Sequence, residues 1–502
     1  MDTLPSSVDY SEPMGVIPAG TENYNVTCYA VNGSSFTAGQ QIIVDLNNVG
    51  YLDPASLSIR YKLALTIPAV GAGQGLTGQS FSIPGCPVYT PILRLDTLFN
   101  SNVVESVNNY NSVATALSNL SMSVSDKMGQ QTSLGYLSQA WAGATYNASA
   151  PVLKIDYSTV NENTDGLTLV VGNGAATATL AGVATITLSA PLPCLLSNAE
   201  KLIPLNGTNV RLQFTLDTQD NVCPSSVSPI STALFQGLDV AGGAPSAGFA
   251  AMGGLPVAGQ FTAYTITNFE VVYNQIQFPP HVERQILAMP KLRIKTSSYA
   301  TGLQTLASGV AGTVNLVYNL RYASIKAMIL LMGASSAGVS GTAANFSGNK
   351  LFESVDITSG GGSYNFQCNG VYYPQNPLST ANNKSGVLTE LRRAMIDLYA
   401  NNSNSMAIDA TEFAKTDASI GAAANVSVQS VSKPGKFYVG VNTAKMSDKA
   451  VFSGISSQNS PITAVINVGS TATIYGYSPI LMCYYDAIIE IDVATKQVNY
   501  IF

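Results

Sequence analysis

The sequence predicts an all-β protein made of two tandem eight-stranded jelly rolls, with a few short helices in the loops. Three observations favour this fold. Short stretches of alternating apolar and polar residues recur along the chain, separated by turns rich in Gly, Asn and Ser. Helical patterns are few. Finally, 502 residues exceed the size at which one hydrophobic core stops growing, so at least two domains are expected.

A series of strand-like segments occurs twice in the same order. The corresponding segments of the two halves are residues 42–47 and 314–319, 58–65 and 324–329, 88–91 and 371–374, and 269–273 and 489–493. In both halves a helical pattern follows the third segment. The shared order indicates an internal duplication. The alternative is that two unrelated β-rich domains look alike at this level of detail.

The first half begins with an extended arm at residues 1–20, which contain three prolines and no clear apolar periodicity. Residues 21–278 are expected to form the first jelly roll. A long insertion at about residues 130–260 interrupts it. Within this insertion, residues 150–190 predict short hairpins, and the Gly-, Ala- and Pro-rich residues 237–259 predict a long loop.

Two segments of the first half have clear periodicity. Every second residue from Leu57 to Leu65 is apolar, which predicts a strand with one buried and one wet face. Apolar residues at steps of three or four between Val103 and Met128 predict a helix. Because Asn and Ser fill its other face, we expect a broken helix or two short ones.

The second half is expected to form a second jelly roll over residues 279–502, after the boundary marked by Pro279 and Pro280. Residues 314–322 alternate as a strand does, and the glycines at 360–362 predict a tight turn between two strands. Residues 389–399 form the clearest helical pattern of the chain. The last apolar residues, at 489–501, predict a hairpin that secures the C-terminus.

The composition points away from nucleic acid and towards packing against other protein. Only 10% of the residues are charged, 46% are hydrophobic, and the net charge is −6. A negatively charged chain without a Lys/Arg-rich arm lacks a broad positive surface for the phosphates of nucleic acid, so no direct sequence-specific binding is expected. A surface rich in uncharged polar residues and tyrosines suits contact with many copies of itself.

The cysteines and termini set further expectations. None of the six cysteines forms a CxxC pair, so we expect buried free thiols and no zinc site. The N-terminus shows no signal peptide. The longest apolar run, residues 327–332, is far shorter than a membrane span of roughly 20 residues.

No catalytic, cofactor-binding or metal-binding residue is predicted. His281 is the sole histidine, and no Gly-x-Ser-x-Gly segment accompanies it. The glycines at 71–78 and 360–362 lack the Gly-Lys-Ser/Thr ending of a phosphate loop. Four acidic residues are expected on helix surfaces, solvated or paired with neighbours such as Arg392 and Arg393, and they are Glu105, Asp126, Glu390 and Asp397. Six tyrosines fit either interface anchoring or ordinary strand packing: Tyr372, Tyr373, Tyr475, Tyr477, Tyr484 and Tyr485.

The organisation of the chain resembles that of the double jelly-roll major capsid proteins of tailless double-stranded DNA viruses. That lineage includes virophages, polinton-like viruses, giant viruses and the adenovirus-hexon group. The segments that carry the resemblance are residues 42–65, 93–95 leading into 103–128, 290–295 followed by 314–332, and 371–378 before 389–399. It covers most of the chain, whereas residues 130–260 match no pattern of the family.

The resemblance implies a homotrimer of pseudo-hexagonal outline that tiles an icosahedral shell and is located in the virion. Loops would form an outward tower, and residues 1–20 would lie inside. The implied partners are neighbouring capsomers and minor capsid, penton or cement proteins. The alternative is a β-sandwich adhesin or surface-array protein, and a carbohydrate-active enzyme is a distant third.

Overall fold

A computed structural model gives the fold of the chain. It describes residues 17–47, 49–67, 80–140, 152–153, 167–170, 182–223, 261–334, 352–381, 384–398, 406–417, 435–445, 452–470, 472–473 and 476–502. Within these residues the strands form five sheets, and no sheet contains strands from both sides of the helix α7 (Pro280–Leu287). The predicted loops at residues 71–78 and 237–259 lie outside the described residues.

The first β-sandwich consists of two facing sheets. In spatial order, one sheet contains β1 (Glu22–Tyr29), β15 (Ala263–Gln277), β5 (Ser58–Ile67) and β12 (Gly182–Pro191). The other contains β3 (Gln41–Asp45), β14 (Val210–Leu216), β7 (Ile92–Phe99) and β8 (Asn102–Asn108). All neighbouring strands in this path are antiparallel.

The second β-sandwich has the same plan. One sheet contains, in spatial order, β16 (Lys291–Leu303), β23 (Tyr477–Asp492), β18 (Ile325–Ala334) and β21 (Tyr438–Asn442). The facing sheet contains β17 (Thr313–Tyr318), β22 (Ile462–Asn467), β19 (Ser363–Cys368) and β20 (Val371–Ser379). These pairs are also antiparallel.

The two sandwiches have identical strand order. If the eight strands of each are numbered along the chain, both have one sheet ordered 1-8-3-6 and a facing sheet ordered 2-7-4-5, which is the jelly-roll arrangement. In both, a helix follows the fifth strand: α1 (Tyr110–Ser121) in the first and α8 (Ser385–Leu398) in the second. The predicted fold class, two tandem jelly rolls with few helices, is confirmed.

One of the proposed correspondences between the halves is wrong. Residues 42–47, 58–65 and 269–273 fall on the second, third and eighth strands, as do their partners in the second half. Residues 88–91, however, form a buried turn before the fourth strand, whereas residues 371–374 lie in the fifth strand, β20. A four-residue similarity carries too little information to set a strand equivalence.

Additional short elements extend the two sandwiches. The strands are β2 (Ser35–Thr37), β4 (Tyr51–Leu52), β6 (Ser80–Ile83), β9 (Leu137–Ala140), β10 (Val152–Leu153), β11 (Leu167–Val170), β13 (Ile203–Pro204) and β24 (Val498–Ile501). The helices are η1 (Pro54–Ser56), α2 (Val124–Gly129), α3 (Gln131–Leu134), α4 (Gln219–Val222) and α9 (Ala410–Ala414). β24 pairs with the end of β23, so the predicted C-terminal hairpin is confirmed.

The hairpins predicted within residues 150–190 are not formed by the described strands. β11 pairs with β6 and β9, and β12 pairs with β5 along its whole length. β10 lies parallel to β12, an arrangement that a tight turn cannot make. Alternation shows that a segment is a strand, but it does not identify the partner.

Alternation places the core as expected. In β5, Ile59, Tyr61 and Leu63 are buried between the two sheets, because their side chains all point to the same face. On the opposite face, Arg60 pairs with Glu270 of the neighbouring strand β15. The strand therefore contributes apolar surface to the sandwich and charge only to its wet side.

The helical prediction for residues 103–128 is half right. Its first part is the strand β8, which pairs with β7, and Asn109 ends the strand in a left-handed conformation with φ +49°. Two short helices follow, α1 and α2, and Ser123 begins α2 with a capping box that includes Asp126. Apolar residues three or four apart occur in strands as well, so periodicity did not distinguish them here.

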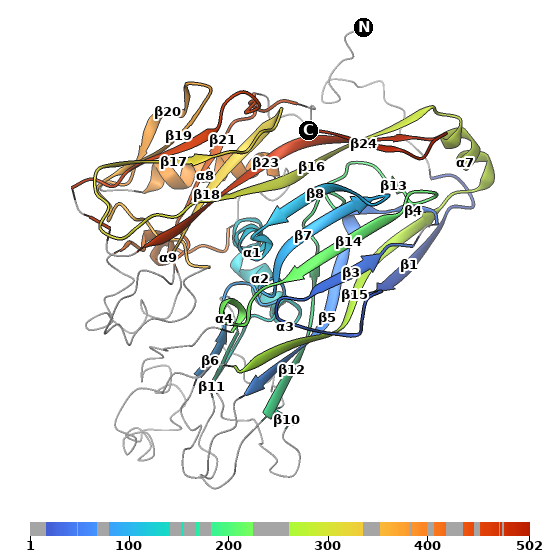
Figure 1. Cartoon of the computed structure of the whole chain (residues 1–502), viewed down its shortest axis with the longest axis horizontal. Helices are drawn as coiled ribbons and strands as arrows, with labels where there is room; N and C mark the ends of the chain where they lie inside the picture. The colour runs from blue at the N-terminus through green and yellow to red at the C-terminus, as the bar shows by residue number, and fades with distance from the viewer. Residues whose placement is uncertain are drawn as a thin grey trace.

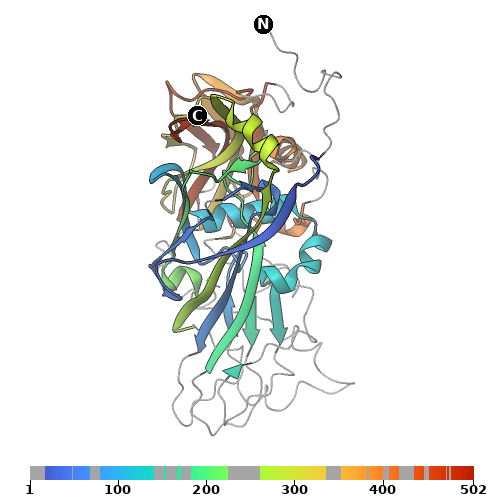
Figure 2. The same cartoon turned by 90° about the vertical axis from the view of Figure 1, so that its right-hand side faces the viewer.

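Figure 1 shows the first jelly roll in blue to green beside the second in yellow to red, with α7 at one end of the molecule. In the side view of Figure 2, the cyan helices that follow β8 lie near the middle of the molecule. The two sandwiches therefore lie alongside each other, which creates a long contact between them.

Candidate functional site at the seam between the jelly rolls

The largest group of polar contacts between the two sandwiches involves β16, the first strand of the second jelly roll. We call this surface the seam: Glu105, Asn108, Leu195, Asn198 and Glu200 of the first jelly roll against residues 295–301 of β16. The side chains of Thr296, Ser297 and Ser298 are buried there. The seam is candidate functional machinery because it fixes how the two sandwiches are presented to any neighbour.

Glu105 is the centre of the seam. Its carboxylate accepts hydrogen bonds from three segments: the Thr97 hydroxyl of β7 at 2.8 Å, the Leu195 amide at 2.8 Å, and the Ser298 hydroxyl of β16. Burial raises the pKa of Glu105 to about 7, and these three hydrogen bonds act in the opposite direction. In the described part of the chain, no lysine or arginine forms an ion pair with Glu105.

The Leu195 peptide group is held from both sides. Its amide donates to Glu105 of the first jelly roll, and its carbonyl accepts a 2.5 Å hydrogen bond from Thr296 of the second. Nearby, Asn198 donates to the Ser297 carbonyl at 3.0 Å, and the Glu200 amide donates to the Lys295 carbonyl at 3.0 Å. Side chains and main chain of the loop after β12 thus follow β16 closely.

The far end of the seam has one more hydrogen bond. The Thr301 hydroxyl donates to the carbonyl of Asn108, the last residue of β8, at 2.7 Å. Lys295 and Glu200 add an ion pair of 3.0 Å at the other end. The seam is therefore satisfied by polar groups along its length, which specifies one relative position of the two sandwiches.

A second contact joins α1 to the second jelly roll. Asn119 of α1 donates to the Tyr438 hydroxyl at 2.9 Å, and its carbonyl accepts from the Ala407 amide at 2.9 Å. The buried Lys127 donates to the Asn119 amide oxygen and lies 4.7 Å from the centre of the Tyr136 ring. Asn119 is thus fixed from both domains, although Asn is a poor residue for a helix interior.

A third contact lies at the turn between β23 and β24. Asn100 donates to the Lys496 carbonyl at 2.8 Å. A Cβ on Gly207, which has φ +76°, would lie 3.1 Å from the Lys496 side chain. Among the described residues the two sandwiches therefore touch at several separate places, and rotation of one against the other would break these contacts.

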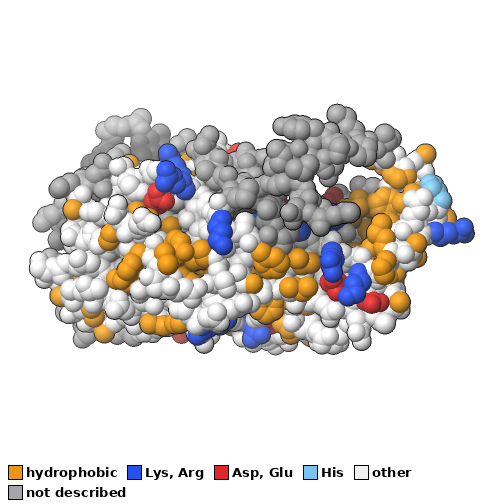
Figure 3. Space-filling view, turned by 90° about the horizontal axis from the view of Figure 1, so that it is seen from above, with side chains coloured by type: hydrophobic (Ala, Val, Ile, Leu, Met, Phe, Trp, Pro, Cys, Tyr) orange, Lys and Arg blue, Asp and Glu red, His pale blue; other side chains and the backbone are white. Residues whose placement is uncertain are grey.

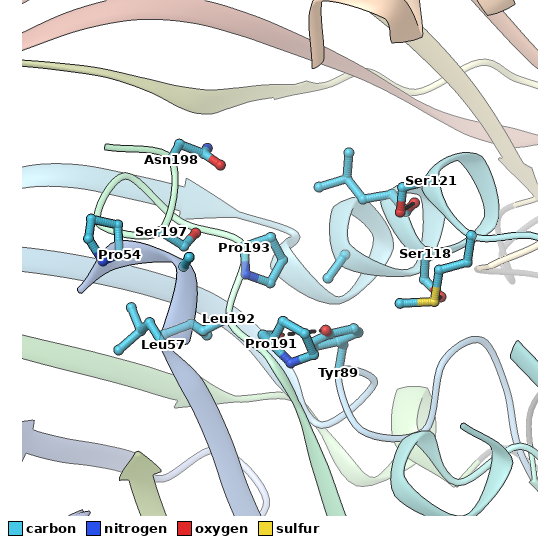
Figure 4. Close-up of a pocket in the computed structure, with 14 residues that line it drawn as sticks. Pro54, Leu57, Tyr89, Ser118, Ser121, Pro191, Leu192, Pro193, Ser197 and Asn198 are labelled. Atoms are coloured by element: carbon cyan, nitrogen blue, oxygen red, sulfur yellow. Dashed lines mark hydrogen bonds between the residues drawn. The ribbon is translucent and has the colours of Figure 1, made fainter. Parts of the chain in front are cut away.

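A pocket of about 250 Å³ lies next to the seam, between η1, α1 and residues 191–198 (Figure 4). Its walls include three prolines, Leu57 and Leu192, and most of its hydroxyl groups donate to main-chain carbonyls, whereas Ser118 bonds the Tyr136 hydroxyl. Tyr89 donates to Pro191 at 2.6 Å, and Ser197 donates to Cys194 at 3.0 Å. Without a charged side chain or an activated nucleophile in its lining, this pocket offers apolar surface and no catalytic group.

The structure places the candidate residues of the sequence as follows. His281 is exposed near the start of α7, the helix that Figure 1 shows at one end of the molecule. Asp126 caps α2, and Glu390 pairs with Arg393 on α8, as expected of helix-surface groups, while Arg392 is exposed. The side chain of Asp397 lies outside the description. The placement of Glu105 on a helix surface is wrong: it lies on a strand and is buried.

The tyrosines divide between core and surface. Tyr477, Tyr484 and Tyr485 are buried in β23, which favours ordinary strand packing for them. Tyr372 on β20 is 44% exposed, and Tyr475 is not described. The six cysteines are free thiols, five of them buried, as predicted.

The outer strand β1 is a candidate surface for contact with another chain. Among the described strands it pairs with β15 alone, so its other edge presents unpaired main-chain groups. Tyr24 and Tyr29 on it are 46% and 63% exposed, and the strand contains neither lysine nor proline, the residues that usually protect such an edge. Figure 3 shows another face, on which charged side chains are few and apolar ones lie among uncharged polar groups.

The described residues contain no group of three or more His, Cys, Asp or Glu side chains that would suit a metal ion. None of their helices has the length and apolar character that a membrane crossing requires.

The comparisons with known proteins agree with the architecture. No family model and no curated protein matches the sequence. Among solved structures, one from the Sputnik virophage superposes with a TM-score of 0.53 at 10% identity, over 100% of this chain and 92% of that one. The Faustovirus major capsid protein gives a TM-score of 0.52 at 10% identity, over 96% and 92% of the two chains.

A third structure covers both chains almost completely. VP54 of PBCV-1, a structure fitted into a reconstruction of Sputnik, gives a TM-score of 0.52 at 10% identity over 98% of this chain and 99% of that one. Such identities concern the fold, and the whole-length coverage includes both sandwiches and the connection between them. The chain therefore has the double jelly-roll fold of viral major capsid proteins.

Proposed function

We propose that this protein is the major capsid protein of an icosahedral virus, and that three copies form a capsomer of pseudo-hexagonal outline. The observation that carries the proposal is the presence, in one chain, of two sandwiches with the same strand order fixed side by side. Three such chains around a threefold axis place six similar sandwiches in a ring. A ring of six packs into a shell with its neighbours as a hexagonal tile does.

The solved structures with this fold support the proposal. They come from the Sputnik virophage, from the capsid of PBCV-1, and from the major capsid protein of Faustovirus. The adhesin or surface-array alternative is not favoured, since the strand order and whole-length coverage match shell proteins. The described residues also bring together no set of groups that would favour an enzyme.

The surface supports self-association. With only 10% charged residues, copies of the chain repel each other little, and interface centres are typically poor in charge. The open edge of β1 supplies main-chain donors and acceptors, and its exposed tyrosines supply large contact area. Both features suit contact with a second copy of the chain.

The proposal assigns parts of the chain to positions in a shell. Residues 21–278 and 279–502 would be the two jelly rolls, with residues 1–20 as an arm on the inner face. The expected insertion at about 130–260 contains the core strands β12 and β14, so only the segments of it outside these two strands would supply the outward tower. The protein would reside in the virion after assembly in the host cell. Minor capsid, penton or cement proteins would be its further partners.

Sedimentation of the purified protein, with charge substitutions on β1, tests the proposal. We expect the wild type to sediment as a trimer. The trimer of the double variant Tyr24→Lys/Tyr29→Lys should already dissociate at a protein concentration at least tenfold higher than the one at which the wild-type trimer dissociates, because lysines on a strand edge oppose strand pairing. Val124→Lys on α2, where the side chain is 43% exposed against 46% for Tyr24, is the control and should leave association unchanged. A wild type that stays monomeric at all concentrations contradicts the proposal. Equal effects of both variants contradict the role of β1.

A further inference from the structure

We propose that Glu105 is a pH-sensitive latch, which holds the two jelly rolls together more firmly when its carboxyl group carries a proton. The proposal stands on the geometry of the seam. One carboxyl group contacts β7 of its own sheet, the loop after β12 and β16 of the second jelly roll, and it is shielded from water. It concerns the isolated chain, so it holds or fails independently of the proposed capsid function.

The surroundings of Glu105 accommodate the neutral form. The Thr97 and Ser298 hydroxyls can accept a hydrogen bond as well as donate one, so a protonated carboxyl group can donate to either without moving the backbone. The same surroundings stabilise the ionised form less well than the neutral form. Three neutral donors replace part of its hydration, but no cation among the described residues pairs with it, and burying an uncompensated charge is costly.

The titratable groups that face Glu105 do not remove this asymmetry. Asp96 of β7 adds negative charge, although Arg94 pairs with it at 2.8 Å. On the other elements the neighbours are Cys194, Tyr322, Tyr485 and Tyr500. Burial raises the pKa of Cys194 to about 12 and raises the pKa values of the three tyrosines, so all four stay neutral near pH 7.

The direction of the pH effect follows from the two states of Glu105. Its pKa is about 7 in the closed seam and near its ordinary value of 4.5 when water reaches it. Below pH 4.5 both states are protonated, and the contribution of the group to the closed seam is fully present. Between pH 4.5 and 7 the open state loses its proton first, so this contribution falls as pH rises. Above pH 7 it stays at its low value.

Glu105→Gln is the matched variant, because the amide has the shape of the carboxyl group and carries no charge at any pH. The readout is hydrogen–deuterium exchange of the full-length protein at pH 4.5, 6 and 8.5, corrected for the intrinsic rate at each pH. Peptides covering residues 192–201 and 291–303 report on the seam, and a peptide covering β5 reports on the sandwich core. Other buried carboxyl groups, such as Asp217, whose pKa is raised by burial, are present in both proteins. The difference between wild type and variant therefore reports on Glu105 alone.

We expect protection of the wild-type seam peptides to fall by about tenfold per pH unit between pH 4.5 and 7, the dependence on one proton. Protection in Glu105→Gln should not follow pH, and the β5 peptide should be unchanged in both proteins. A seam whose protection is independent of pH in the wild type, or varies equally in the variant, overturns the proposal.

A second variant keeps the test decisive should Glu105→Gln fail to fold. Ser298→Ala removes a hydrogen bond that lowers the pKa of Glu105, so the loss of seam protection should end at a higher pH than in the wild type. Thr301→Ala is its control on the same strand, since Thr301 bonds the Asn108 carbonyl and leaves the carboxyl group untouched. An unshifted transition in Ser298→Ala, or an equal shift in Thr301→Ala, contradicts the assignment to Glu105.

Discussion

At the scale of single residues, the molecule uses a small number of buried polar groups to fix the position of large apolar ones. Glu105 in the seam and Asn119 on α1 each connect both jelly rolls. Neither role was predictable, because a sequence shows that a residue is polar but not which distant segment will bury it. Glu105 was also assigned to a helix, since Val103 and Val107 have a spacing that a helix and a strand share.

The buried ion pair between Lys436 and Glu412 should matter far more than an exposed one. Its atoms lie 3.1 Å apart, and both side chains are less than 5% exposed. We expect Lys436→Met to lower the free energy of unfolding by about 3 kcal/mol, because it removes the cation that pairs with the buried Glu412 carboxylate. Denaturant unfolding measures this change.

Arg393→Ala on α8 is the control for that measurement. Arg393 pairs with Glu390, but the arginine side chain is 64% exposed, so water screens the pair. The expected loss is below about 1 kcal/mol. Equal losses for the two variants would show that burial does not set the strength of these pairs.

At the scale of elements, the sequence predicted whether a segment is a strand or a helix better than it predicted which strands pair with each other. Strict alternation correctly located β5 and β17, and the three-to-four spacing located α8, which begins four residues earlier than expected. The pairings of β10 and β11 were missed, because their partners are far away in the chain. Hydrophobic pattern is local information, whereas sheet order depends on contacts between distant segments.

The glycines at 360–362 lie in a turn, as predicted, but the strand expected before it is absent from the described residues 352–357, and only β19 follows it. The turn offers a sharp test of element geometry. A Cβ on Gly362 would lie 1.9 Å from the Asn467 carbonyl oxygen of β22, a main-chain atom that cannot move aside cheaply. Gly362→Ala should therefore cost about 3 kcal/mol of unfolding free energy. In thermal or denaturant unfolding, the variant should melt well below the wild type.

The adjacent glycine is the natural control. A Cβ on Gly361 would have its nearest neighbour at 3.9 Å, an ordinary contact, and its φ lies outside the left-handed region. Gly361→Ala should stay within about 1 kcal/mol of the wild type, since it also reduces the freedom of the unfolded chain. If Gly362→Ala is as stable as Gly361→Ala, the close approach of the turn to β22 is not real.

At the scale of the whole molecule, the low charge, the duplicated sandwich and the fixed seam all favour regular packing of many copies of the chain. The composition indicated packing against copies of the chain, and the repeated order of segments indicated two similar domains. The sequence did not reveal how the two domains are joined, because the contacts between them involve residues scattered from Asn100 to Lys496. A rigid pair of sandwiches is what a shell needs, since each copy must present the same outline to its neighbours.

Single-particle electron microscopy of the purified protein shows whether three copies of this chain form one capsomer. We expect particles of three times 52.4 kDa, about 157 kDa, with a threefold axis and six sandwich-shaped densities arranged in a ring. Particles of one chain, or an assembly whose symmetry does not place six sandwiches in a ring, would contradict this expectation.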